Sequence, residues 1–284
     1  MKLRIALFVI AASGLTFAQA PPSFPPAELD RLVQRVALYP DPLLAQVLSA
    51  STFADQIPDA AHWADEHHYL TGDALANAIT QDQLPWDPSV QALLPFPSVL
   101  GMMAADIDWT TQLGNAVLAQ RPDVMDAVQR MRAVATRYGY LRTGPRIVVT
   151  PGPFITILPV NPAFVYVPFY DPAIVFVGPR PGYAITFGFG FNIGIAFRPW
   201  GWGVVRVDWA SHGWFVHDAL WGRTWANRAV YVHNYPGLKR FDHPGPRPAA
   251  APAHPEGHKL VERSAKEKEA ERKGGKREEE HHER

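Results

Sequence analysis

The feature that most constrains the fold of this chain is a change in the spacing of its hydrophobic residues near Gly144. Before this glycine, apolar residues recur every three or four positions, which is typical of amphipathic helices. After it, short β-branched and aromatic runs are separated by proline or glycine, which is typical of short strands. We therefore predict an α+β protein, with a multi-helix domain over residues 28–138 and a β-rich aromatic segment over residues 144–235.

Aspartate and proline supply the start signals of the predicted helices. Asp41-Pro42 and Asp87-Pro88 each place an N-capping carboxylate before a proline at the first helical position. Asp108 is expected to cap the helix that begins at Trp109, and Gly139 is expected to stop the last helix. Further predicted helices cover Pro58–Glu66, Asp73–Thr80, Ser98–Ala105, Trp109–Gln120 and Pro122–Arg137.

The predicted strands are short because prolines interrupt them. They cover Arg146–Thr150, Phe154–Leu158, Phe164–Phe169 and Ile174–Val177. In residues 183–198 the odd positions are large and apolar and the even positions are small or polar, so one face would be apolar. A run of this length favours a hairpin, and a three-residue loop at 192–194 would keep the alternation on both strands.

The N-terminus has the features of a secretory signal peptide. Lys2 and Arg4 precede a short apolar region, and Ala18-Gln19-Ala20 has the small-residue form of a cleavage site. Because Pro21 disfavours cleavage after Ala20, cleavage after Ala18 is the alternative. With residues 1–20 as a signal peptide, we expect an exported protein in the periplasm or at the cell surface. No later apolar stretch reaches the roughly 20 residues of a membrane-spanning helix, so we expect no such span in the mature chain.

Charge is balanced over the whole chain but not along it. The chain has 27 basic and 27 acidic residues, which argues against a nucleic-acid binder. Residues 28–137 carry an excess of acidic residues and residues 139–255 an excess of basic ones. Opposite fields favour association of the two parts, and unrelated surfaces on a tether are the alternative. Residues 244–284 are proline-rich and then densely charged, so we predict that they are disordered.

Few patterns in the chain indicate metal binding. The absence of cysteine excludes disulfides, thiolate metal sites and a cysteine nucleophile. His62 and Glu66 lie one helical turn apart and could share a metal ion. No motif fixes a third ligand near them or near His67 and His68, so a solvated helix end is the favoured interpretation.

Two other groups suggest catalysis only by their residue types. Asp106 and Asp108 could form the acid pair of a hydrolase, although a helix N-cap accounts for Asp108. Ser211, His212 and Asp218 lack the strand–turn–helix elbow that activates a serine nucleophile. We therefore predict no catalytic residues, no metal site and no cofactor, and expect that the protein is not an enzyme.

Tryptophan is concentrated in the β-rich segment. Six of the nine tryptophans are Trp200, Trp202, Trp209, Trp214, Trp221 and Trp225. Exposed indoles could stack on sugar rings and form a binding platform for a cell-wall glycan such as peptidoglycan. Tryptophans interrupted by glycine also fill small cores, and this is the favoured of the two interpretations.

Three ordered stretches resemble a known bacterial family. They are ELDRLVQRVALYPDPLLAQVLSASTFADQI from Glu28, followed by Trp63 and GDAL at 72–75; PWDPSVQALLPFPSVLGMMAADIDWTTQLGNAVLAQRPDVMDAVQRMR from Pro85; and PVNPAFVYVPFYDP at 159–172. The chain is similar over about residues 28–178 to the exported domain-of-unknown-function family 3300. The resemblance implies a location in the bacterial envelope and no established activity, cofactor or catalytic residue.

From the residues and the resemblance together, we expect an exported envelope protein of unknown molecular activity. A non-enzymatic structural or interaction role is the favoured hypothesis. A glycan-binding module that uses the tryptophan-rich region is the alternative, and a hydrolase comes third. The expected partners are envelope components, either peptidoglycan or another envelope protein, and not nucleic acid.

Overall fold

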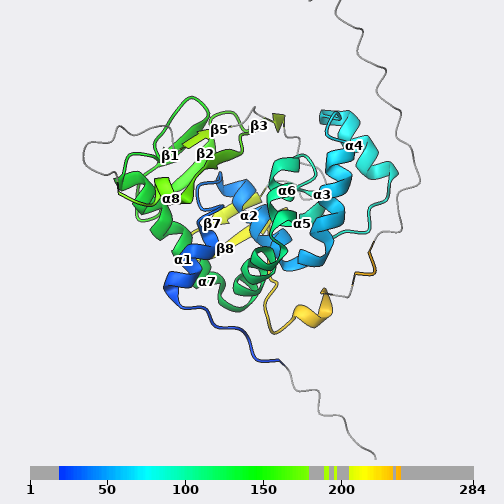
Figure 1. Ribbon diagram of the computed structural model, residues 1–284, viewed down its shortest axis with the longest axis horizontal. Helices are drawn as coiled ribbons and strands as arrows, with labels where there is room; N and C mark the ends of the chain where they lie inside the picture. Colours follow the sequence, from blue (N-terminus) through cyan, green and yellow to red (C-terminus); the bar gives the residue numbers. More distant parts are fainter. Residues whose placement is uncertain (1–18, 179–188, 192–194, 197–204, 233–234, 238–284) are drawn as a thin grey trace, which may run out of the picture. The chain divides into compact units, whose positions relative to one another are not determined.

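The computed structural model describes residues 19–178, 189–191, 195–196, 205–232 and 235–237 (Figure 1). It has the predicted α+β architecture, mostly helical up to Arg137 and with short antiparallel strands after it. The helices are α1 (Pro26–Val33), α2 (Asp41–Ala50), the 3-10 helix η1 (Ser51–Gln56), α3 (Ile57–Glu66), α4 (Gly72–Gln81), α5 (Pro88–Gln91), α6 (Pro97–Ala105), α7 (Ile107–Arg137), α8 (Pro172–Val175) and the 3-10 helix η2 (Arg228–Val230). The strands are β1 (Ile147–Thr150), β2 (Thr156–Pro159), β3 (Phe164–Val165), β4 (Pro168–Tyr170), β5 (Phe189–Phe191), β6 (Ile195–Ala196), β7 (Val205–Asp208), β8 (Gly213–Val216) and β9 (Ala219–Leu220). The described residues fall in one compact unit that extends to Gly237.

Helix α7 is the element around which the helical part is built, because α1, η1, α2 and α6 all pack on it. It spans 31 residues and joins the two helices predicted on either side of Arg121, with a kink at Gln120 (φ −140°, ψ 43°). Pro122 causes this kink. Its ring would clash with the carbonyl of Leu118 in a straight helix, and it has no N–H to donate to that carbonyl. The freed Leu118 carbonyl accepts a hydrogen bond of 2.8 Å from the backbone N–H of Trp225 instead.

The end of α7 confirms the predicted glycine stop. Gly139 has a φ of +79°, a left-handed conformation that favours glycine. The backbone N–H groups of Gly139 and Tyr140 donate to the carbonyls of Thr136 and Ala135, which satisfies two of the last carbonyls of the helix.

The Asp-Pro pairs behave differently from one another. Asp87 caps α5 as predicted, because its carboxylate accepts from the Ser89 N–H at 2.9 Å. The prediction that Asp41 caps α2 is wrong: its carboxylate points into the interior and accepts hydrogen bonds from Arg132 and Trp209.

The predicted cap of α7 is also wrong by two residues. Asp106 takes the N-cap position and accepts from the Trp109 N–H at 3.1 Å, whereas Asp108 lies exposed in the first turn of the helix. The side-chain oxygen of an N-cap residue reaches the N–H two or three residues later, so Asp106 is the residue placed to bind Trp109.

The strands form small antiparallel sheets. β1 pairs with β2, β3 with β6, β4 with β5, and β7, β8 and β9 form a three-stranded sheet in that order. In the alternating stretch 183–198, the structure describes β5 and β6, which pair with β4 and β3. The expected loop at 192–194 and the rest of this stretch lie outside the described residues.

One predicted strand is wrong. The run Ile174–Val177 was expected to be extended. Its first two residues instead form the end of helix α8, which starts at Pro172, and Phe176 is the C-cap of that helix. Asp171 caps this helix through a hydrogen bond of 2.8 Å from the Ala173 N–H. Asp171-Pro172 is therefore a third helix start of the kind predicted at Asp87, and here the local signal outweighed the β-branched composition of the run.

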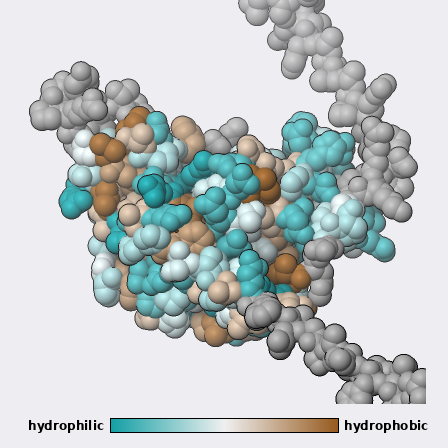
Figure 2. Space-filling view, turned by 60° about the horizontal axis from the view of Figure 1, so that its bottom comes forward, coloured by the Kyte–Doolittle hydropathy of each residue, from teal (hydrophilic) through white to brown (hydrophobic). Residues whose placement is uncertain are grey.

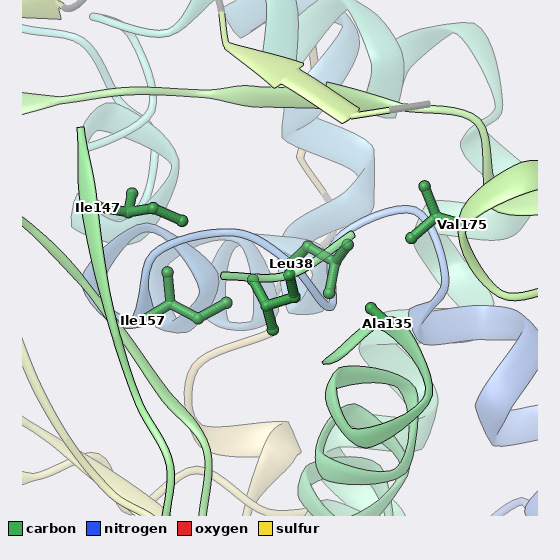
Figure 3. Close-up of a cluster of buried hydrophobic side chains, with 6 residues drawn as sticks. Leu38, Ala135, Ile147, Ile157 and Val175 are labelled. Atoms are coloured by element: carbon green, nitrogen blue, oxygen red, sulfur yellow. The ribbon is translucent and has the colours of Figure 1, made fainter. Parts of the chain in front are cut away.

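The helical and β-rich parts share their hydrophobic core. Figure 3 shows a cluster in which Leu38, Ala135 at the end of α7, Ile147 and Ile157 of the first sheet, and Val175 of α8 face one another. All five side chains are buried. The association of the two parts, favoured by their opposite charge, is thus carried mainly by apolar packing.

Polar contacts outside this cluster also join the two parts. Two pairs join acidic residues of the helical part to basic groups after Gly139. Arg223 Nη2 lies 2.7 Å from Asp87 Oδ2, and His212 Nε2 lies 3.0 Å from Asp126 Oδ1. The Arg223–Asp87 pair matches the charge segregation seen in the sequence.

Helix α7 and η1 approach each other closely at a glycine. A Cβ atom on Gly114 would overlap the carbonyl oxygen of Ser51 and would lie 2.6 Å from its carbonyl carbon. Only a residue without a side chain fits between these two backbones.

The surface mixes polar and apolar residues. Figure 2 shows one face on which hydrophobic side chains form small areas among hydrophilic ones. Exposed large apolar residues include Val148, Leu158, Val160, Phe164, Phe169, Ile174 and Val177. Within the described ranges, no helix has both the length and the hydrophobicity to cross a membrane. The predicted disordered residues 244–284, and residues 1–18 of the predicted signal peptide, lie outside those ranges.

Candidate functional site

A cavity of about 380 Å³ lies between the helical part and the last described residues. Its volume falls in the range of small-molecule binding sites, roughly 300–1,000 Å³. It is lined by Phe53, Gln56, Pro85, Trp86, Asp87, Tyr231, Tyr235, Pro236 and Gly237. Four aromatic rings therefore surround a space that also contains one amide and one carboxylate.

The helical wall of this aromatic cavity is held by hydrogen bonds around the start of α5. Gln91 Nε2 donates to the carbonyls of Leu84 and Trp86 at 3.0 and 2.8 Å. The Asp87 N–H donates to Gln56 Oε1 at 2.7 Å. These bonds pair backbone groups of Leu84, Trp86 and Asp87, and they hold the turn that precedes α5 in place. The position of the Trp86 indole depends on this turn.

The opposite wall comes from residues near the end of the described chain. The Trp86 indole donates from Nε1 to the Tyr235 hydroxyl at 3.0 Å, and the Tyr235 N–H donates to Asp55 Oδ2 at 3.2 Å. Burial raises the pKa of Tyr235, so its hydroxyl is neutral at any physiological pH. The cavity thus offers a neutral phenol as a polar group.

Arg223 supports the cavity from behind its aromatic wall. Its guanidinium carbon lies 4.6 Å from the ring centroids of both Phe53 and Tyr231, which is cation–π geometry with two rings. The same guanidinium forms an ion pair with Asp87. Arg223 therefore connects the start of α5 to the rings of Phe53 and Tyr231.

The tryptophans predicted as a platform lie elsewhere. Trp209, Trp214 and Trp221 are buried, and the first two donate from their indoles to Asp41 and Ser49, each at 3.0 Å. These three are core residues in this structure, as the favoured interpretation of the pattern predicted, and they are not available to stack on a glycan. None of them lines the cavity.

Three tryptophans of the set remain. Trp225 is half-buried and donates to the carbonyl of Gln19 at 2.9 Å. The guanidinium of Arg228 covers its ring at 3.8 Å from the centroid. Trp200 and Trp202 lie outside the described residues.

The histidine cluster is arranged as a helix end. His62 and Glu66 are exposed and 3.3 Å apart, while His67 stacks on the Trp63 indole with centroids 4.0 Å apart. Among the residues that the structure describes, no three metal-binding side chains converge. His68 is close to the backbone of Asp65 and adds no ligand to the pair.

The structure does not bring Ser211, His212 and Asp218 together. Ser211 Oγ lies near the Asp208 carbonyl, His212 pairs with Asp126, and Asp218 sits in the turn between β8 and β9 with a φ of +62°. They do not form a triad.

The Asp106 carboxylate is bound by two groups at the start of α7. It forms an ion pair of 2.8 Å with Arg35 in addition to its bond from Trp109. The Trp109 N–H, and then the hydrogen bond from Arg35, hold the pKa of Asp106 below the usual carboxyl range. A carboxyl group that stays ionised in this way cannot act as a general acid near neutral pH.

The aromatic cavity was not predicted from the sequence. Trp86 stands before an Asp-Pro pair, and this position predicted a helix start but not a cavity. Nothing in the sequence indicated that Phe53 and Trp86 would meet Tyr231 and Tyr235, because these residues are far apart along the chain.

Comparisons with known proteins agree with the resemblance seen in the sequence. Residues 25–243 match the family model described as a protein of unknown function, DUF3300. The uncharacterized protein YacH of Escherichia coli (strain K12) is 37% identical over 200 residues, which cover 59% of this chain and 32% of YacH. The chain therefore corresponds to about a third of the length of that relative. No solved structure matches it. Since the matched region covers most of the chain, the protein belongs to the DUF3300 family.

Proposed function

We propose that the protein is exported to the bacterial envelope and acts there, in the periplasm or at the cell surface, as a non-enzymatic protein with a structural or interaction role. The observation that carries this proposal is the aromatic cavity, where four rings, an amide and a supported carboxylate surround about 380 Å³. Sites that bind small groups are typically apolar and aromatic with a few fixed polar groups.

The first twenty residues support export. A positively charged start, a short apolar region and small residues at Ala18 and Ala20 are the parts of a secretory signal.

The cavity supports binding without catalysis. Its carboxylate, Asp87, accepts hydrogen bonds from Ser89 and an ion pair from Arg223. Both oxygens of this carboxylate are therefore engaged by groups of the protein itself. The other lining residues are aromatic side chains, an amide, prolines and a glycine, and no serine, cysteine, lysine or histidine is among the described residues that line the cavity.

A cell-wall glycan is the second candidate, now at the aromatic cavity. Aromatic rings carry negative charge on their faces and attract the C–H groups of sugar rings. The Gln56 amide nitrogen has no partner among the described residues, so it can donate to a sugar hydroxyl.

In-cell crosslinking tests the interaction role. A photo-crosslinking amino acid is placed at position 235 in the cavity wall and, as a control, at position 69, where Tyr69 is exposed outside the cavity. We expect adducts with an envelope component from position 235 only. Equal adducts from both positions, or none from position 235, would overturn the proposal.

Sedimentation with purified peptidoglycan and titration with N-acetylglucosamine oligosaccharides, followed by tryptophan fluorescence, test the second candidate. Tyr235→Ala removes one wall of the cavity and should weaken binding, whereas Tyr69→Ala should bind like the parent. Binding unchanged in Tyr235→Ala would exclude the cavity, and a parent that binds no glycan would exclude this candidate.

A further inference from the structure

Three buried side-chain N–H groups, one in α7 and two just after β9, have no hydrogen-bond partner among the described residues. They belong to Arg121 Nε, Trp221 Nε1 and Arg223 Nη1. Buried polar groups are nearly always paired, and an unpaired one often marks a position where an ion or a water molecule binds. No other buried side-chain nitrogen or oxygen in the described residues is unpaired.

The three groups belong to one cluster. The Arg121 guanidinium lies over the Trp221 ring, 4.6 Å from its centroid, and Nη1 donates to the Trp221 carbonyl at 3.1 Å. Arg121 Nη2 donates to the carbonyl of Arg223. The kink of α7 brings these residues together, because the freed Leu118 carbonyl binds the backbone of Trp225 just after them.

The cluster has an excess of positive charge. Both described hydrogen bonds of Arg121 go to backbone carbonyls, which carry no net charge. Arg223 has a single carboxylate partner, Asp87, and Arg228 donates to the Trp225 carbonyl. Burial lowers the pKa of Arg121, as expected for a guanidinium in a site without a neutralising anion.

A water molecule would be a poor occupant for such a site. It could accept only about two of the three N–H groups, and its own hydrogens would need acceptors. The oxygens of a phosphate or a carboxylate accept several N–H bonds at once and also neutralise the guanidinium groups.

We infer that Arg121, Trp221 and Arg223 form an anion-binding centre that takes an oxyanion, either a phosphate or a carboxylate group. The centre lies behind the Phe53–Tyr231 wall of the cavity, where Arg223 contacts both rings. It does not depend on the proposed glycan binding, because its ligand is a charged group and the N-acetylglucosamine oligosaccharides that probe glycan binding are neutral.

Thermal unfolding of the full chain in increasing inorganic phosphate, and separately in acetate, tests the centre. Sodium chloride at the same ionic strength removes the general effect of salt. We expect saturable stabilisation by at least one of the two oxyanions beyond the chloride control, since a ligand that binds only the folded state raises its stability. Which of the two acts identifies the class of anion.

Variants locate the effect. Arg121→Met should weaken the binding of the active anion about ten-fold or more, since it removes a hydrogen bond to a charged group. Trp221→Phe keeps an aromatic ring at this position but removes the Nε1 donor together with part of the indole, so it gives a second test of the centre if Arg121→Met does not fold. Arg130→Met, which removes a surface arginine paired with Asp30, is the control and should respond like the parent.

Three results would overturn the inference. They are equal unfolding in phosphate, acetate and chloride, an unchanged response in both Arg121→Met and Trp221→Phe, and an equal loss of response in Arg130→Met. Loss of response in a cluster variant with the response kept in Arg130→Met supports it.

Discussion

Arg132 Nη1 lies 2.6 Å from Asp41 Oδ1, and both side chains are buried between the helical and β-rich parts. Asp41 also accepts hydrogen bonds from the Ile157 N–H and the Trp209 indole. The guanidinium of Arg132 lies over the Trp209 ring, 4.7 Å from its centroid. One ion pair therefore connects α2 and α7 with β2 and with Trp209, the residue after β7.

Removing one partner of this pair should be costly. Arg132→Met leaves the Asp41 carboxylate buried without its counter-ion, so we expect a loss of about 3–5 kcal/mol in the free energy of unfolding. Arg130→Met, which breaks the partly exposed pair with Asp30 on the same helix, should cost about 0–1 kcal/mol. Urea unfolding followed by circular dichroism measures both. Similar costs would show that burial of the Asp41–Arg132 pair does not matter.

Trp214 should behave as a core residue. It is 1% exposed and stacks on Trp221 with ring centroids 4.8 Å apart. Trp214→Ala should destabilise the protein by about 3–5 kcal/mol, because it leaves a cavity and removes the indole donor to the Ser49 hydroxyl. Trp225→Ala, at a half-buried position, should cost clearly less. If Trp214→Ala is as stable as the parent, Trp214 is not a core residue.

Two helical glycines should respond to alanine with opposite signs. Gly114→Ala places a Cβ against the Ser51 backbone, and such overpacking typically costs about 1–3 kcal/mol or more. Gly101→Ala in α6 meets nothing within 4 Å, so the higher helix propensity of alanine should stabilise the protein by about 0.5–1 kcal/mol. Thermal unfolding of both variants checks the signs. Equal effects would contradict the close approach of α7 and η1.

The cap of α7 should make stability depend on pH. Because the folded state holds the pKa of Asp106 below its usual range, the stabilisation is complete above the unfolded pKa of about 3.9. It is lost as the pH falls through the lowered folded value. The parent should therefore be more stable than Asp106→Asn near pH 6, and this difference should shrink below about pH 4.

Asp108→Asn is the matched control for that comparison, since Asp108 lies in the same turn but does not cap the helix. We expect it to unfold like the parent across the same pH range. A pH-independent difference between the parent and Asp106→Asn would argue against the charged cap.

If the chain is exported as we propose, mass spectrometry of the N-terminus of the protein from the envelope fraction should distinguish the two cleavage sites. Cleavage after Ala18 keeps Gln19, whose carbonyl accepts from the Trp225 indole, whereas cleavage after Ala20 removes that acceptor. We therefore expect Gln19 as the first residue. A mature chain that starts at Pro21, or an intact Met1, would contradict this expectation.

The sequence predicted the elements of this protein better than it predicted what their side chains bind. The helical pattern and the stop at Gly139 were confirmed because they depend on neighbours within one turn. Asp41 and Asp87 have the same local context, but only Asp87 caps its helix, because the partner of Asp41 is Arg132, 91 positions away.

Similar reasoning applies to the candidate site. The clustering of tryptophans was visible, but burial depends on what covers each ring, and Trp214 is covered by α2 and its Ser49. The two sides of the aromatic cavity, Trp86 and Tyr235, are 149 positions apart. No period or motif connects residues at such a separation.

The hydrogen bond between Trp225 and Gln19, 206 positions apart, has a consequence for how the chain folds. Contacts between distant residues require large loops to close, which makes folding slow. The bond between Trp86 and Tyr235 likewise cannot form until nearly all of the described chain has been synthesised. A chain that we propose is exported would thus remain incompletely folded during most of its synthesis, which is the condition in which it can still be threaded through a membrane channel.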